Sequence, residues 1–188
     1  MTKYEKTTIA LGVTGSIAAF KACELTSALV REGFDVNVIM TASACKLVCP
    51  KSFLTLSRNP VMTDLWEDKD WQPGHIELAM RAKLLVIAPA TANIMAKMAH
   101  GIADDALSTF YISHTGPVIV APAMNPRMWA HPATQANVAL LKERGVAFAG
   151  PDSGRVACGE DGPGRLCSLD VIIKQIKTSI NIQKGNKK

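Results

Sequence analysis

Three side chains that could take part in proton transfer or hydrogen bonding stand in unusual surroundings. Cys158 lies in a glycine-rich segment, 151–167, and a connection of that length without secondary structure is uncommon in a compact domain unless it has a function. Asn125 is flanked by two prolines, which either hold the amide in place or simply stiffen a loop. His75 follows a glycine and precedes a short helical pattern, although an isolated histidine is more often structural than catalytic.

Small and hydroxyl residues follow two of the predicted strands. In the segment 12–18 (GVTGSIA) a glycine turn and the hydroxyl of Ser16 stand where a helix begins, a place that favours a phosphate. Ser16 as an ordinary helix cap is the alternative. The segment 89–93 (PATAN) suits close approach of a flat ligand, unless its threonine only caps the next helix. A dinucleotide would require an acidic residue after the second strand, and 40–43 (MTAS) has none, so a mononucleotide phosphate is favoured.

The elements that must position these residues alternate along the chain. Continuous apolar runs, typical of strands covered on both faces, alternate with segments whose apolar residues recur at helical spacing. This order predicts an α/β fold: a doubly wound, Rossmann-like or flavodoxin-like parallel sheet with helices on both faces and ligands beyond the carboxyl ends of the strands. The length suits a single domain over 1–188, with a floppy tail at about 183–188. The predicted strands are 7–13, 36–40, 84–88, 118–121 and 146–149, and the predicted helices are 16–32, 92–98, 105–112, 134–144 and 169–182.

Composition argues against several classes of function. The formal net charge is +5, but part of it stands in the C-terminal tail and no basic face alternates with aromatics, so nucleic acid is not an expected partner. The first apolar stretch is too short for a signal peptide or a membrane span, which predicts a cytoplasmic protein. Cysteines are then expected as thiols. Cys45 and Cys49 are expected to be buried, since no second pair follows at zinc-ligand spacing, and no metal site is predicted.

Taken together, these segments resemble the motifs of the homo-oligomeric flavin-containing cysteine decarboxylases. The resemblance covers nearly the whole chain, and the order of the motifs is that of the family. Ile94 departs from the family pattern, which has a threonine there. Within the family, the stretch 157–166 (ACGEDGPGRL) is similar to the substrate-clamping loop of enzymes of coenzyme A biosynthesis. The other matching segments are 15–18 (GSIA), His75, 89–93 (PATAN) and 122–129 (PAMNPRMW).

The resemblance implies a flavoprotein that binds FMN and decarboxylates phosphopantothenoylcysteine to phosphopantetheine. Loss of CO2 from a cysteine leaves a carbanion without an adjacent carbonyl, so an electron sink is needed. By family analogy the substrate thiol is oxidised at the flavin, CO2 leaves, and the resulting enethiol is reduced again. Cys158 is expected to donate the final proton, because a thiol with a pKa of about 8.5 is mostly protonated at neutral pH. The glycines after it are expected to let the loop close over the substrate.

The same resemblance implies a homotrimer, often assembled into a dodecamer, and a possible phosphopantothenate-cysteine ligase as partner. The alternatives are a peptidyl-cysteine decarboxylase, a flavin prenyltransferase or a non-catalytic regulatory flavoprotein of the same fold. His75 is expected to assist thiol oxidation, and Asn125 to hold the substrate carboxylate with its amide. The residues implied at the FMN site are Gly15, Ser16, Ile17, Thr41, Ser43, Ala90, Thr91, Asn93, Ser108 and Met124, and those at the substrate are Asn125, Met128, Ala157, Cys158, Gly159 and Arg165.

Overall fold

The computed structural model describes residues 6–66 and 74–185 of the chain, with side chains over 6–66 and 76–181. Its centre is a five-stranded parallel sheet with strand order β2-β1-β3-β4-β5. The strand order reverses between β1 and β3, and in open α/β sheets such a switch point is where ligands bind. The strands are β1 (Thr8–Val13), β2 (Asp35–Met40), β3 (Leu84–Ala90), β4 (Val118–Pro122) and β5 (Ala147–Phe148).

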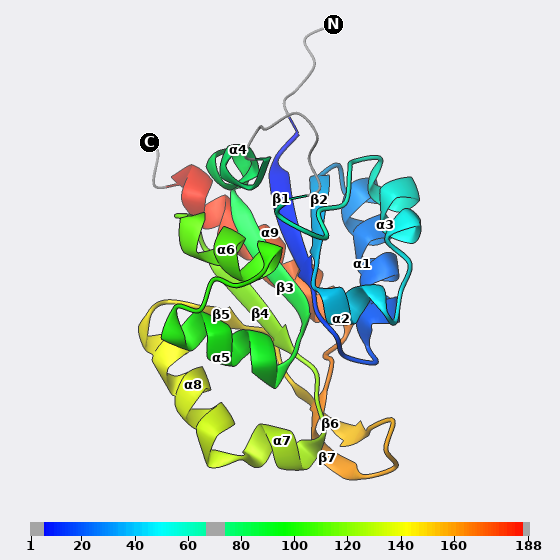
Figure 1. Cartoon of the computed structure of the whole chain (residues 1–188), viewed down its shortest axis with the longest axis vertical. Helices are drawn as coiled ribbons and strands as arrows, with labels where there is room; N and C mark the ends of the chain where they lie inside the picture. Colours follow the sequence, from blue (N-terminus) through cyan, green and yellow to red (C-terminus); the bar gives the residue numbers. More distant parts are fainter. Residues whose placement is uncertain (1–5, 67–73, 186–188) are drawn as a thin grey trace, which may run out of the picture.

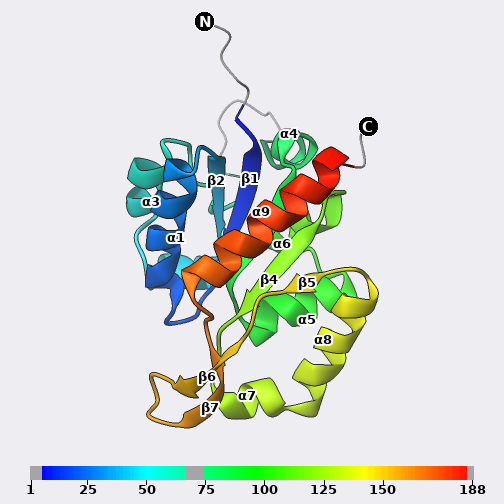
Figure 2. The ribbon, with the colours of Figure 1, turned by 180° about the vertical axis from the view of Figure 1, so that it is seen from behind.

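Helices cover both faces of this sheet. Figure 1 shows α4, α5 and α6 in front of the strands, and Figure 2, the view from behind, shows α9 crossing the opposite face. The apolar residues accordingly form two clusters, one under α1, α3 and α9 and one under α4, α5, α6 and α8. The helices are α1 (Ala19–Arg31), α2 (Ala42–Cys45), α3 (Pro50–Ser57), α4 (Gly74–Arg81), α5 (Ala92–His100), α6 (Ala106–Ser113), α7 (Pro126–Ala130), α8 (Pro132–Glu143) and α9 (Leu169–Gly185).

The continuous apolar runs form strands because they supply side chains to both clusters at once. In β1, Ile9 and Leu11 point into one cluster and Ala10 into the other, and all three are fully buried. A strand covered on both faces needs no polar alternation. The predicted doubly wound α/β sheet is therefore confirmed.

The glycine-rich segment 151–167 is not a structureless connection. It folds into an antiparallel hairpin of β6 (Asp152–Arg155) and β7 (Asp161–Arg165), separate from the main sheet. Glycine and proline have low strand propensity, so the composition concealed this pairing. At the other end of the molecule, α9 continues to Gly185, into the segment expected as a tail; residues 186–188 lie outside the described part.

None of the helices that the structure describes is both long enough and apolar enough to cross a membrane. Within the same residues, no disulfide joins the five cysteines, as expected of thiols. Neither Cys45 nor Cys49 is buried as expected: Cys45 is partly exposed, and Cys49 is exposed as the N-cap residue of α3.

Candidate active site

A cavity of about 470 Å³ opens at the carboxyl ends of the central strands. Its walls come from the segments that follow β1, β3 and β4, and from the β6–β7 hairpin, which Figure 1 places at the same end of the molecule. This volume lies within the range of pockets that hold a cofactor or a drug-sized ligand. The lining residues are Gly15, Ser16, Ile17, Ala18, Phe20, Lys21, Thr91, Ala123, Met124, Asn125, Met128, Arg155, Val156, Ala157, Cys158, Gly164, Arg165 and Leu166.

The loop between β1 and α1 presents its backbone to the cavity. The helix begins at Ala19 and no side chain caps it. The N–H groups of Ala19 and Lys21 already bond the carbonyl oxygens of Ser16 and Ala18. Within the described residues those of Ile17 and Phe20 have no such partner, so they can bind an anion. Ser16 is therefore not the helix cap, and its hydroxyl accepts a hydrogen bond from Ala18 N at 3.3 Å. A Cβ at Gly15 would overlap the side chain of Ser43, so only glycine lets this loop pack against the start of α2.

Thr14 joins the loops on the two sides of the switch point. Its hydroxyl donates to the carbonyl oxygen of Pro89 at 2.7 Å and accepts from the N–H of Thr91 at 3.1 Å. The residue is 1% exposed, and a buried hydroxyl with both bonds made fixes its surroundings. We did not single out Thr14 from the sequence, although a hydroxyl between the first strand and its glycine turn is the signal that would have found it.

Asn125 is part of a closed ring of polar contacts with Arg127 and Glu160. It is the N-cap of α7, and its Oδ1 accepts from Arg127 N at 2.7 Å. This bond directs the NH2 group away from the helix, where Nδ2 donates to Cys158 Sγ at 3.1 Å and to Glu160 Oε2 at 3.0 Å. The other carboxylate oxygen of Glu160 pairs with Arg127 Nη2 at 2.8 Å, which closes the ring.

Close backbone contacts seat the hairpin on the segment that carries Asn125. Met124 N donates to the carbonyl oxygen of Gly164 at 2.9 Å, and a Cβ at Gly164 would overlap Met124 O. A Cβ at Gly162 would crowd Pro126 at 3.0 Å. These glycines permit close packing rather than the flexibility that we expected of them.

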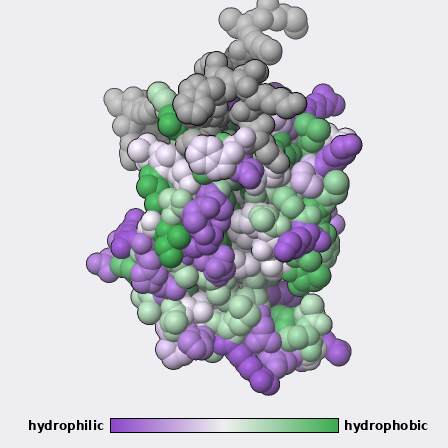
Figure 3. Space-filling view, viewed as in Figure 1, coloured by the Kyte–Doolittle hydropathy of each residue, from purple (hydrophilic) through white to green (hydrophobic). Residues whose placement is uncertain are grey.

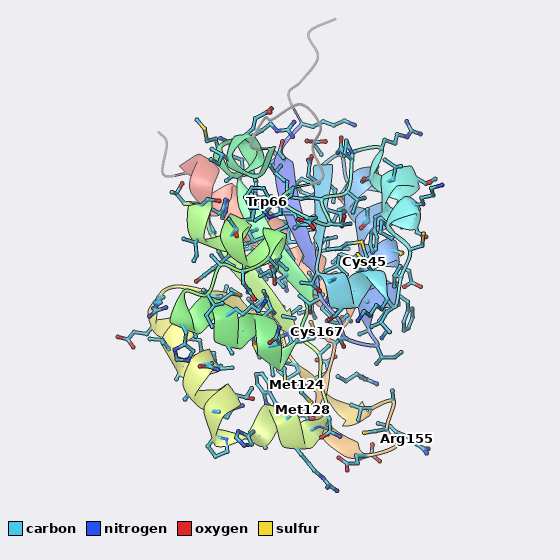
Figure 4. All side chains as sticks on the ribbon, viewed as in Figure 1. Cys45, Trp66, Met124, Met128, Arg155 and Cys167 are labelled. Atoms are coloured by element: carbon cyan, nitrogen blue, oxygen red, sulfur yellow. The ribbon has the colours of Figure 1, made fainter. Side chains whose placement is uncertain are left out.

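The structure brings most of the expected substrate residues, and half of the expected FMN residues, to this cavity. Figure 4 shows Met124 and Met128 at the end of the molecule that carries the hairpin. The expected residues that line the cavity are Gly15, Ser16, Ile17, Thr91, Met124, Asn125, Met128, Ala157, Cys158 and Arg165.

The remaining expected residues do not line it. Thr41 and Thr91 both cap helices with their side chains. The alternative role predicted for Thr91, that of a helix cap, is therefore confirmed, and the same residue also lines the cavity. Ser108 is 1% exposed and its hydroxyl belongs to the capping box of α6. The His75 backbone starts α4, but its side chain lies outside the described residues. Four others lie outside the lining. Ser43 packs against Gly15, and Ala90 is buried at the end of β3. Asn93 is exposed on α5, and Gly159 directly follows Cys158.

The described residues contain no group of three or more histidine, cysteine or acidic side chains that could hold a metal ion. A neutral flat ligand and an anionic group fit the lining better. Ile17, Met124 and Met128 supply apolar surface, while the backbone at the start of α1 supplies N–H donors.

Comparisons with known proteins agree with this arrangement. The Flavoprotein family model matches residues 1–181. The bifunctional coenzyme A biosynthesis protein CoaBC of Bacillus subtilis is 47% identical over 167 residues, which are 88% of this chain and 41% of that protein. A probable phosphopantothenoylcysteine decarboxylase of Streptococcus mutans is 42% identical over 175 residues, 92% of this chain and 98% of that protein. The chain thus spans about two fifths of the bifunctional relative and nearly all of the shorter one.

Two solved structures share the fold closely. A PPC decarboxylase mutant complexed with pantothenoylaminoethenethiol superposes with a TM-score of 0.83 at 30% identity, over 93% of this chain and 98% of that one. The FMN-dependent cysteine decarboxylase SpaF gives a TM-score of 0.82 at 34% identity, over 94% and 96%. With matching sequence, fold and extent, this chain belongs to the flavoprotein family that contains the phosphopantothenoylcysteine decarboxylases.

Proposed function

We propose that this chain binds FMN and decarboxylates phosphopantothenoylcysteine to phosphopantetheine, a step of coenzyme A biosynthesis. One observation carries the proposal: the Asn125 amide and the Cys158 thiol, 33 positions apart in the sequence, meet at 3.1 Å at the wall of the cavity. A probable phosphopantothenoylcysteine decarboxylase at 42% identity over nearly its whole length supports the same substrate.

The residues at the switch point fit FMN. The uncapped start of α1, with Gly15 and Ser16, would hold the phosphate, and Thr91 and Met124 would lie against the flat ring system. When bound there, FMN supplies an acceptor for the two electrons of thiol oxidation and a donor that returns them.

Asn125 and Cys158 act on the cysteine end of the substrate. The Asn125 NH2 group, directed by its bond to Arg127 N, would donate to the substrate carboxylate. Its two donors bond Cys158 Sγ and Glu160 Oε2 in the ligand-free arrangement, so the carboxylate would replace one of these acceptors. The Cys158 thiol, beside it, donates the proton that replaces CO2. His75 remains assigned to assisting oxidation of the substrate thiol, on the resemblance alone.

The reaction consumes no external oxidant. Oxidation of the substrate CH2–SH group to a thioaldehyde removes two electrons and two protons, and the carbon–carbon bond to the carboxylate then breaks to leave an enethiolate. The same two electrons return with one proton, as hydride, to the carbon that bears the sulfur, a second proton goes to the carbon that lost CO2, and a third restores the thiol. The net change exchanges CO2 for a proton.

The test uses the purified protein with FMN and phosphopantothenoylcysteine. The wild type should bind FMN and form phosphopantetheine, and Cys158→Ser should release CO2 but accumulate the oxidised enethiol, detected by mass spectrometry. Cys49→Ser is the matched control, because Cys49 is also exposed but lies outside the cavity. A protein that cannot be loaded with FMN, or that decarboxylates only peptides ending in cysteine, would overturn the proposal.

We further propose that the chain works as a homotrimer or a dodecamer in the cytoplasm, alongside a phosphopantothenate-cysteine ligase. Ile17 and Phe20 at the cavity are 63% and 55% exposed, and apolar side chains at a ligand site suit burial by a second subunit. The bifunctional relatives, of which this chain matches about two fifths, support a partner enzyme. Light scattering of the FMN-loaded protein tests the oligomer, and a monomer would refute it.

A further inference from the structure

Hydrogen bonds tie together the chain segments at the carboxyl ends of β1, β3 and β4. The Thr14 hydroxyl, directly after β1, donates to the carbonyl oxygen of Pro89 at 2.7 Å and accepts from the N–H of Thr91 at 3.1 Å. The N–H of Ala123, directly after β4, donates to the carbonyl oxygen of Ala90 at 3.0 Å. The walls of the cavity are therefore joined behind the surface that they present to a ligand, and the joint between β1 and β3 depends on a side chain.

Both bonds of the Thr14 hydroxyl are shielded from water. The residue is 1% exposed and does not itself line the cavity. Figure 3 shows hydrophilic side chains at the end of the molecule where the cavity opens, and water competes for exposed hydrogen bonds at such a surface. A buried hydroxyl that donates and accepts at the same time holds its two partners at fixed places. Thr14 is thus suited to keep two segments of the chain at one separation.

The two segments that Thr14 joins serve different parts of one ligand site. Gly15 and Ser16 follow it directly, at the place proposed for the FMN phosphate, and Thr91 lines the cavity at the place proposed for the ring system. FMN carries its phosphate and its ring system at the two ends of one ribityl chain. Both ends bind at full strength only where the two segments already stand at the matching distance, because a site that must first be ordered binds more weakly.

We propose that Thr14 is a positioning residue for FMN: its hydroxyl sets the spacing between residues 14–18 and residues 89–91, and thereby the affinity for the flavin. The inference rests on the proposed function, because it takes the FMN site from there. Without the hydroxyl, the N–H of Thr91 loses this bond and the two segments are free to separate. The affinity for FMN should then fall although every side chain that lines the cavity is unchanged.

Thr26 provides a matched control. It is 0% exposed, and its hydroxyl donates to the carbonyl oxygen of Ala22 at 2.8 Å. Both residues belong to α1 and neither lines the cavity. Thr14→Val and Thr26→Val each replace a buried hydroxyl by a methyl group of similar size, but only the first breaks a bond between two segments of the FMN site.

The experiment measures release of FMN from the loaded protein. The protein is diluted over a range of concentrations, and the fluorescence of free flavin gives the Kd. Thr14→Val should raise the Kd by at least about tenfold, whereas Thr14→Ser, which keeps the hydroxyl, should stay within about threefold of wild type. Thr26→Val should stay within about twofold. If circular dichroism shows that Thr14→Val does not fold, Thr14→Ala takes its place with the same expected rise.

Three results would overturn the inference. An unchanged Kd in the variant without the hydroxyl would mean that the spacing does not depend on this bond. An equal rise in Thr14→Ser would assign the effect to the packing of the methyl group. An equal rise in Thr26→Val would assign it to a general loss of stability. All three leave the proposed function standing, whereas a wild type that binds no FMN would refute the proposed function itself.

Discussion

Replacing Glu160 with glutamine tests whether the ring of hydrogen bonds around Asn125 positions the amide that we propose to bind the substrate carboxylate. Glu160 bonds Asn125 Nδ2 at 3.0 Å and pairs with Arg127 at 2.8 Å. Glutamine keeps the size and one acceptor oxygen but removes the charge. A hydrogen bond to a charged group contributes about 1 kcal/mol more than a neutral one. The ion pair adds at most about 1 kcal/mol, since the side chain of Arg127 is 85% exposed and that of Glu160 34%.

These magnitudes predict a selective loss of function. If the free energy needed to hold the Asn125 amide in place rises by about 1 to 2 kcal/mol in the variant, the activation free energy rises by the same amount and kcat/KM should fall by about 5- to 30-fold. Asn125 also bonds the Cys158 sulfur, so the oxidised enethiol should form a larger share of the product. Global stability in urea should change by less than about 1 kcal/mol, because the hairpin pairs outside the main sheet.

The assay is steady-state kinetics with mass spectrometry of both products. Glu143→Gln, the same substitution at an exposed position of α8, should behave as wild type. Arg127→Gln should show part of the effect, and the double variant with Glu160→Gln should be no worse than Glu160→Gln alone, since both act on one ring. A Glu160→Gln enzyme with kcat/KM and product ratio within twofold of wild type would refute the reasoning.

Three further predictions concern the rest of the molecule. Gly15→Ala should weaken FMN binding by about tenfold or more in a fluorescence titration, because its Cβ overlaps Ser43 and displaces the loop; unchanged affinity would contradict this packing. Burial alone would raise the pKa of Asp105, but its bonds to Lys97 and to the start of α6 hold that pKa below its usual value. The stability that the ionised group contributes is therefore present above about pH 4 and lost as the pH falls through the lowered pKa, so the urea-measured difference between wild type and Asp105→Asn should shrink in acid. Burial raises the pKa of the Cys167 thiol to about 11, so this residue should resist maleimide at neutral pH until the protein unfolds, and peptide mass spectrometry would reveal early labelling.

The sheet could be predicted from the sequence because burial on both faces leaves a direct trace. The residues of β1, β3 and β4 are all buried, and their continuous apolar runs reveal this without any knowledge of tertiary contacts. The hairpin left no such trace. Its second strand reads DGPGR, a composition that predicts a loop, and it pairs because the backbone of Gly164 meets Met124 in another segment.

The candidate site shows the same division. The motifs placed Asn125 and Cys158 at one site, and the structure joins them directly. The ring through Arg127 and Glu160 could not be predicted, since it depends on how the hairpin docks on α7 and both residues otherwise look like ordinary surface charges. For Ser108 the prediction and the structure differ. Its hydroxyl was expected to contact the ligand, but it forms part of the capping box at the start of α6. Sequence pattern alone does not distinguish a ligand-binding hydroxyl from a helix-capping one.

The glycines around Cys158 therefore have a different role from the one that their number suggests. Gly162 and Gly164 have almost no room for a side chain, and each faces the segment that carries Asn125. A loop held by such contacts is positioned by the fold, and the thiol at its tip inherits that position through the Asn125 amide. The turn from Val156 to Glu160 is less crowded than the strands, since a Cβ at Gly159 would meet no atom within 4 Å. Close backbone contacts thus seat the strands of the hairpin, whereas its turn, beside Cys158, has open space around it.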